Sequence, residues 1–95
     1  MAMEGLDRVL RDRESAHLER WAATRSSYPQ EWLEAWFTRV GITRLTPAEL
    51  TEINDKIAEL LAPYEMRDEA GEAPAEALPI WLSAYGFPIS QERGR

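Results

Sequence analysis

The hexapeptide Leu45-Thr46-Pro47-Ala48-Glu49-Leu50 carries the clearest helix start in this chain of 95 residues. A threonine followed three residues later by a glutamate can form a capping box, in which each side chain accepts a hydrogen bond from the other residue's backbone amide. Proline suits the first helical position because its missing N–H has no partner there. The apolar residues that follow recur at helical spacing, and they are Leu50, Ile53, Ile57, Leu60 and Leu61. We therefore predict an amphipathic helix that starts after Thr46 and that Pro63 stops or kinks.

Two further helices are predicted upstream of this signal. Apolar residues recur every three or four positions between Leu6 and Thr24, which indicates an amphipathic helix. Ser27 and Gln30 then have the spacing of a second capping box. The short helix expected after them carries two tryptophans and a phenylalanine, and Gly41 suits the position just past its end. A helix this short with so many aromatic residues must be covered by other parts of the molecule.

Two segments have the composition of strands. Residues 42–45 are partly β-branched, and residues 79–89 alternate around a run of apolar side chains between two prolines. We therefore expect an α+β fold that is mainly helical, with the order α-α-β-α-β and a small two-stranded sheet. One domain over residues 1–95 fits the chain length. Residues 65–77 are acidic and small, which favours a mobile loop, and residues 90–95 are expected to form a flexible tail.

Charge and composition exclude several classes of function. The net charge is −6, with 11 basic and 17 acidic residues, which opposes direct contact with DNA. The chain has no cysteine and one histidine, His17, so we predict no metal site and no cofactor. No basic segment with a following apolar run opens the chain, and no apolar stretch approaches the roughly 20 residues of a membrane span. We expect a cytoplasmic protein without membrane contact.

The usual components of an active site are missing from the sequence. No serine lies in a G-x-S-x-G motif, and the five glycines are scattered singly rather than gathered in a phosphate-binding loop. Neighbouring helical glutamates are typical of a solvated surface. We therefore predict that the protein is not an enzyme and has no catalytic residues.

The aromatic residues are the candidate binding site, and they are Trp32, Trp36, Phe37, Trp81 and Tyr85. They can line a pocket for an apolar or cationic ligand. They can also form the core together with a homodimer interface, and we favour this second interpretation because a small domain needs its aromatic residues for packing.

Four stretches of the sequence form a recognisable order. They are Tyr28-Pro29-Gln30-Glu31-Trp32-Leu33-Glu34-Ala35, Leu45 to Leu50, Ala58-Glu59-Leu60-Leu61-Ala62-Pro63-Tyr64, and Leu78 to Pro88 with its ending Tyr85-Gly86-Phe87-Pro88. Taken together, they resemble the C-terminal region of actinobacterial ArsR-type winged-helix transcriptional regulators. The resemblance spans about residues 8–89. It implies a dimerisation and effector-binding region, with DNA contacted only through a separate winged-helix domain. No such domain precedes these residues, so the chain is expected to be an excised C-terminal domain or a stand-alone relative. Metal sensing by cysteines does not carry over.

The sequence thus yields a leading hypothesis and two alternatives. The leading one is a non-enzymatic regulatory module that forms a homodimer within a transcriptional regulator. The alternatives are a sensor of a small apolar ligand and a stand-alone acidic adaptor or inhibitor that binds a protein partner.

Overall fold

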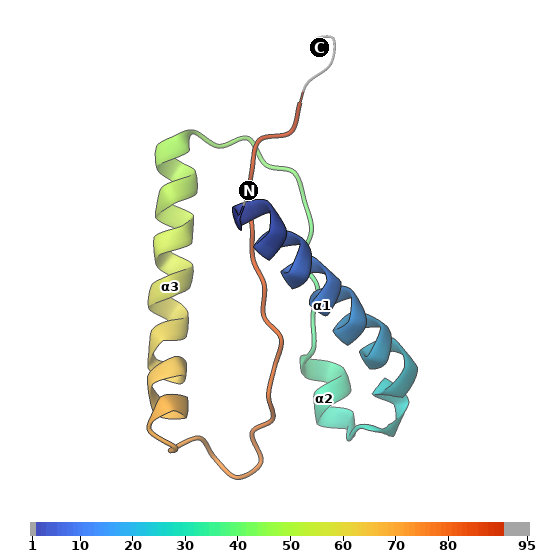
Figure 1. Ribbon diagram of the computed structural model, residues 1–95. Coiled ribbons are helices and arrows are strands. Elements are labelled where there is room, and N and C mark those ends of the chain that lie inside the picture. Colours follow the sequence, from blue (N-terminus) through green and yellow to red (C-terminus); the bar gives the residue numbers. More distant parts are fainter. Residues whose placement is uncertain (1, 91–95) are drawn as a thin grey trace. The chain divides into compact units, whose positions relative to one another are not determined.

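The computed structural model describes residues 2–90, and the chain divides into two compact units, Met1–Gly41 and Ile42–Arg95. The first unit contains α1 (Ala2–Thr24), the short 3₁₀ helix η1 (Arg25–Ser27) and α2 (Gln30–Ala35). The second contains α3 (Pro47–Glu69) and a long extended segment that follows it (Figure 1). The two units are described separately below, and the single domain predicted from chain length stays a prediction.

The first unit is built around the end of α1, which confirms the first predicted helix. The Oγ1 of Thr24 donates a hydrogen bond to the carbonyl of Arg20 at 2.8 Å, and the Oγ of Ser27 donates to the carbonyl of Thr24 at 2.7 Å. The amide of Tyr28 then donates to the carbonyl of Arg25 at 3.0 Å. The bonds to the carbonyls of Thr24 and Arg25 satisfy acceptors that a helix end leaves without partners, and all three bonds tighten the turn that leads into α2.

The second helix is shorter than the sequence predicted. The capping box between Ser27 and Gln30 is wrong, because Pro29 is the N-cap residue and makes no side-chain cap. The side chain of Ser27 is bonded to the preceding turn, and that of Gln30 donates to Glu34 at 3.2 Å. The helix also ends at Ala35 rather than near Gly41. Aromatic and β-branched residues follow, and their low helix propensity favours the extended backbone found there.

The capping box that begins α3 is confirmed. The amide of Glu49 donates to the Oγ1 of Thr46 at 3.1 Å, and the amide of Thr46 donates to the Oε1 of Glu49 at 2.9 Å, with Pro47 in the first turn. The helix continues through Pro63 to Glu69, so Pro63 does not stop it. Proline removes the hydrogen bond to the carbonyl four residues earlier, and the helix retains its other bonds on either side.

The acidic segment after α3 begins as helix. Residues 65–69, expected to open a loop, lie in the last turns of α3. Gly71 then adopts a left-handed conformation with φ of 73°, and its amide donates to the carbonyl of Asp68 at 3.0 Å. The amide of Glu72 donates to the carbonyl of Arg67 at 2.8 Å. A left-handed glycine of this kind satisfies the last carbonyls of a helix, so α3 ends where its backbone bonds are completed. The mobility expected of the acidic segment stays a prediction.

The predicted α+β class is wrong, since no residue between 2 and 90 belongs to a strand. Residues 42–45 and 79–89 are extended but form no ladder with each other. A strand requires a partner in register, and Pro79 and Pro88 each remove a backbone donor. A ladder as short as residues 42–45 allow is also marginal by itself. The order of elements is helical throughout, with extended connections.

The C-terminal extended segment, residues 78–90, runs back beside α3 within the second unit (Figure 1). At Gly86 the segment lies against this helix, since an added Cβ would be 3.0 Å from the Cδ1 of Leu50. Most of the tail expected at residues 90–95 lies outside the described residues.

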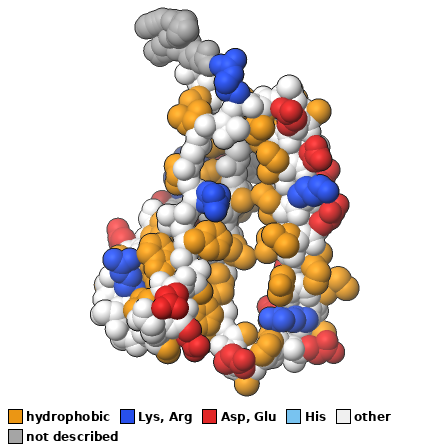
Figure 2. Space-filling view, turned by 180° about the vertical axis from the view of Figure 1, so that it is seen from behind, with side chains coloured by type: hydrophobic (Ala, Val, Ile, Leu, Met, Phe, Trp, Pro, Cys, Tyr) orange, Lys and Arg blue, Asp and Glu red, His pale blue; other side chains and the backbone are white. Residues whose placement is uncertain are grey.

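The hydrophobic side chains are largely exposed. Among residues 5–90, none falls in the buried class, and 21 large hydrophobic residues are exposed. Figure 2 shows hydrophobic side chains at the surface along α3, interspersed with charged ones. Neither unit therefore encloses a core of its own among the described residues.

Candidate functional site

The first unit contains an aromatic cluster of Trp21, Tyr28 and Trp36. The ring of Trp21 lies edge-to-face with those of Tyr28 and Trp36, at centroid distances of 5.1 and 5.8 Å. The guanidinium carbon of Arg25 lies 5.5 Å from the centroid of Trp36, in a cation–π contact. The turn after α1 brings these residues together, because it places Tyr28 and α2 next to the last turn of that helix. The cluster ties α1 to the residues that follow it.

The indole N–H of Trp21 is the polar group that this cluster shields. Its Nε1 is inaccessible to solvent and has no hydrogen-bond acceptor among the described residues. Edge-to-face packing offers such an N–H the π face of a neighbouring ring as a weak acceptor. Tyr28 and Trp36 are themselves 38% and 40% exposed. The cluster therefore presents aromatic surface to the solvent while its centre is closed.

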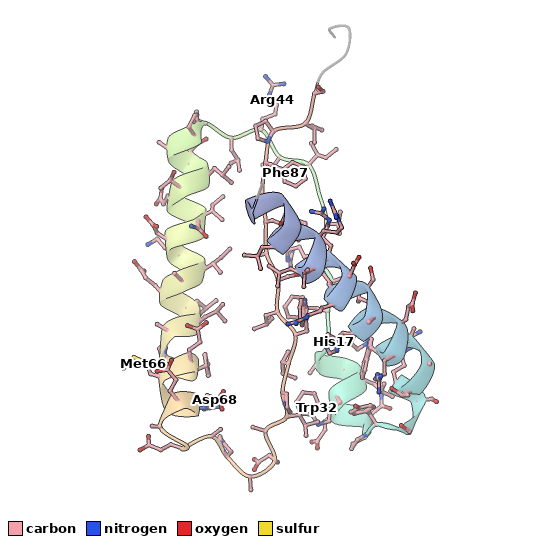
Figure 3. All side chains as sticks on the ribbon, in the orientation of Figure 1. His17, Trp32, Arg44, Met66, Asp68 and Phe87 are labelled. Atoms are coloured by element: carbon pink, nitrogen blue, oxygen red, sulfur yellow. The ribbon has the colours of Figure 1, made fainter. Side chains whose placement is uncertain are left out.

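The second unit contains a separate aromatic pair. The rings of Tyr85 and Phe87 stack at a centroid distance of 6.3 Å, and their side chains are 72% and 66% exposed. Residues two apart in an extended chain lie on the same face, which explains their contact. Figure 3 shows Phe87 on the C-terminal extended segment. This pair forms an open hydrophobic surface.

A small hollow lies between α3 and the extended segment of the second unit. It has a volume of about 280 Å³ and is lined by Leu50, Thr51, Asn54 and Gly86. Its apolar side is the Leu50 side chain, and its polar groups come from Thr51 and Asn54. The hollow is open to solvent and small for a binding site, since ligand pockets typically enclose about 300–1,000 Å³.

The five residues predicted as a site are divided between the two units. Trp32, Trp36 and Phe37 lie in the first unit, and Trp81 and Tyr85 lie in the second. Trp36 enters the cluster around Trp21, and Tyr85 pairs with Phe87.

The remaining predicted site residues differ in exposure. Trp32 is partly covered on α2 (Figure 3), Phe37 is 68% exposed and Trp81 is 42% exposed. Which of these five residues share a ligand pocket or a dimer interface stays a prediction.

The structure brings three residues outside the predicted site into the aromatic contacts, and they are Trp21, Tyr28 and Phe87. The spacing of Tyr85 and Phe87 was a usable signal, because two aromatic residues two positions apart in an extended segment share a face.

Within residues 2–90, no three His, Cys, Asp or Glu side chains come together in a way that suits a metal ion. Neither α1 nor α3 has the hydropathy of a membrane span, and no other helix in that range does. Comparisons with protein-family models, with curated proteins and with solved structures find no match for this chain.

Proposed function

We propose that this chain is a non-enzymatic, cytoplasmic regulatory module that forms a homodimer and supplies the dimerisation part of a transcriptional regulator. The observation that carries the proposal is the exposure of large hydrophobic side chains in both units. The exposed side chains include those of Phe37 and Tyr85, which are 68% and 72% exposed. Extensive exposed apolar surface marks an interaction site. A second copy that covers this surface completes the core.

The energetics of association favour this interpretation. Burying one large hydrophobic side chain contributes roughly 1.5–3 kcal/mol. The association of two chains costs about 4–15 kcal/mol in lost motion. An interface that covers several of the exposed side chains in each copy offsets that cost, so a homodimer is stable at moderate concentration.

The regulatory role is supported by the resemblance to the C-terminal region of ArsR-type regulators and by the charge of the chain. With a net charge of −6, this module leaves DNA contact to a separate winged-helix domain. A two-fold dimer then sets the spacing of two such domains on a two-fold operator. In this proposal the exposed aromatic residues also bind the effector, which is a small apolar molecule.

The test is the oligomeric state of the chain across concentration. Sedimentation velocity from nanomolar to high micromolar protein is expected to show a reversible monomer–dimer equilibrium. Tryptophan emission is expected to shift to the blue as the dimer forms, because association removes water from exposed indoles. A monomer at every concentration contradicts the proposal.

A second candidate function rests on the charge of α3. Seven acidic and two basic residues lie along this helix, which gives it a net negative charge. Figure 2 shows acidic side chains along it, together with basic and hydrophobic ones. An acidic adaptor or inhibitor uses such a surface to bind a basic partner. This function predicts a monomer whose binding to a basic protein weakens steeply with salt.

A further inference from the structure

We propose that the homodimer forms by antiparallel pairing of residues 80–87 with the same residues of a second copy, about a two-fold axis at Ser83. The inference rests on the proposed homodimer and names its interface. The pairing joins two chains, and the fold of each single chain stays as described, without strands.

Unused backbone groups lie along this segment. Within residues 2–90, the backbones of Ile80, Leu82, Ala84 and Gly86 make no hydrogen bond. Alternate residues of an extended chain direct their N–H and C=O groups toward the same edge, so these four residues share one edge. An unpaired edge of this kind is a template for another extended chain.

Two prolines mark the ends of the proposed pairing. Pro79 and Pro88 lie on either side of residues 80–87, and neither has a backbone N–H. The available ladder is therefore eight residues long, which is a sufficient length for a strand in a protein. Antiparallel pairing of two identical segments is the arrangement that a two-fold axis generates.

A register centred on Ser83 matches large side chains with small ones. It places Leu82 opposite the partner's Ala84 and Ile80 opposite the partner's Gly86, once on each side of the axis. Ser83 then lies opposite the partner's Ser83 as a pair without mutual hydrogen bonds, where the two Cα atoms approach to about 4.5 Å. The small side chain at Ser83 fits this closest approach.

The same register pairs the aromatic residues of the other face. Trp81 lies opposite the partner's Tyr85, again once on each side of the axis. Directly opposite aromatic pairs are among the favourable cross-strand contacts. Tyr85 is 72% exposed and already stacks on Phe87, so a further ring extends an existing stack and covers exposed surface.

The α3 helix covers part of the opposite face. At Gly86 the Cβ direction meets the side chain of Leu50 at 3.0 Å. At this point the segment therefore turns the face of its even-numbered residues toward α3. The free edge lies to the side of that contact, so a second copy can pair along it while each segment keeps its own helix.

The absence of charge along the segment allows a second copy to approach there. Two chains of net charge −6 repel each other, so their interface is favoured where charge is absent. Residues 77–91 form the longest stretch of the sequence without a charged side chain. The residues that pair in the self-complementary register, 80–87, all lie within this neutral stretch.

A cysteine cross-linking experiment tests the register, because the chain has no cysteine of its own. In the Ser83→Cys variant the two sulfurs lie across the axis, with a Cα separation inside the range of about 4.4–6.8 Å that disulfides require. Leu82→Cys is the matched control. In this control, position 82 of one chain and position 82 of the other are diagonal neighbours about 7–8 Å apart, which is outside the range that disulfides require. Mild oxidation is expected to link Ser83→Cys at least about tenfold faster than Leu82→Cys.

Amide hydrogen exchange of the natural chain, followed by NMR at dimer-forming concentration, is the second measurement. The amides of Leu82, Ala84 and Gly86 are expected to be protected, while those of Tyr85 and Phe87, on the opposite edge, exchange rapidly.

The outcomes separate this inference from the proposed function. A dimer by sedimentation in which Leu82→Cys links as fast as Ser83→Cys, or in which exchange shows no alternation, overturns the pairing and leaves the homodimer in place. A monomer at every concentration overturns both. Selective linking of Ser83→Cys together with alternating protection supports both.

Discussion

Thr46 and Glu49 cap each other at the start of α3, through hydrogen bonds of 3.1 and 2.9 Å between the side chain of each residue and the amide of the other. The two bonds satisfy two of the backbone donors that the helix start would otherwise leave without partners. The C-terminal extended segment runs beside α3, the helix that these bonds begin. The capping box therefore stabilises the helix on which the second unit is built.

Replacing Thr46 with alanine removes the side-chain acceptor for the Glu49 amide. We expect Thr46→Ala to lower the free energy of unfolding by about 1 kcal/mol. The measurement is urea unfolding followed by far-UV circular dichroism. Thr43→Ala, in the extended segment before the helix, is the control, and an equal loss there would show that the cap is not the cause.

Gly71 adopts a left-handed backbone conformation, with φ of 73°, that residues with a Cβ atom rarely adopt. We expect Gly71→Ala to destabilise the chain by roughly 1–2 kcal/mol, because a Cβ in the left-handed region meets the neighbouring carbonyl oxygen. Gly41→Ala is the control, since its added Cβ has no atom within 4 Å and its φ is not in the left-handed region. We expect the control to be neutral or slightly stabilising. The midpoint of thermal unfolding compares the two variants, and an unchanged midpoint for Gly71→Ala would contradict the helix end described here.

Pro63 lies inside α3 and interrupts its hydrogen-bond ladder. We expect Pro63→Ala to increase helicity and to raise the free energy of unfolding by up to about 3 kcal/mol. Pro47→Ala, in the first turn of the same helix, changes little because no internal bond is missing there. Circular dichroism at 222 nm, a wavelength where helix signal is measured, follows both variants. A loss of helicity in Pro63→Ala would be inconsistent with a continuous α3.

Trp36 contributes an edge-to-face contact and a cation–π contact to the cluster around Trp21. We expect Trp36→Leu to destabilise the first unit by about 1–2 kcal/mol and to reduce the near-UV circular dichroism of the aromatic residues. Phe37→Leu is the adjacent control, and its side chain is 68% exposed. Equal effects of the two substitutions would show that the cluster adds no specific stability.

Trp81 belongs to the segment proposed as the dimer interface. We expect Trp81→Ala to weaken the dimer by about thirtyfold or more in Kd, the effect of losing an aromatic hot spot. Val40→Ala is the control, because that side chain is 96% exposed and lies outside the segment. Sedimentation equilibrium measures both constants, and an unchanged Kd for Trp81→Ala would place the interface elsewhere.

Local signals predicted the helices well and the packing poorly. The capping box at Thr46 and the apolar spacing that follows act within a few residues of the chain, so they identify α3 without further information. The apolar spacing from Leu6 to Thr24 identified α1 for the same reason. The second helix was predicted too long, because Trp36 and Phe37 were taken as part of a helical face, whereas both lie beyond its end at Ala35.

For the candidate site, too, the sequence predicted individual residues but not their contacts. The sequence identified Trp36 and Tyr85 as candidates for a ligand pocket or a dimer interface, but it did not reveal that Trp36 contacts Trp21 or that Tyr85 contacts Phe87. Residues 79–89 were predicted as a strand of a two-stranded sheet. That prediction is wrong, because no residue within 2–90 belongs to a strand.

The sequence by itself determined where α1 and α3 lie and that α3 starts at a capping box, because those features depend on bonds between residues at most four positions apart. Only the tertiary structure decided which rings meet, how far α2 extends and that the extended segments lack a ladder. Ring contacts and strand pairing depend on the path of the chain between distant residues, and no local pattern specifies that path.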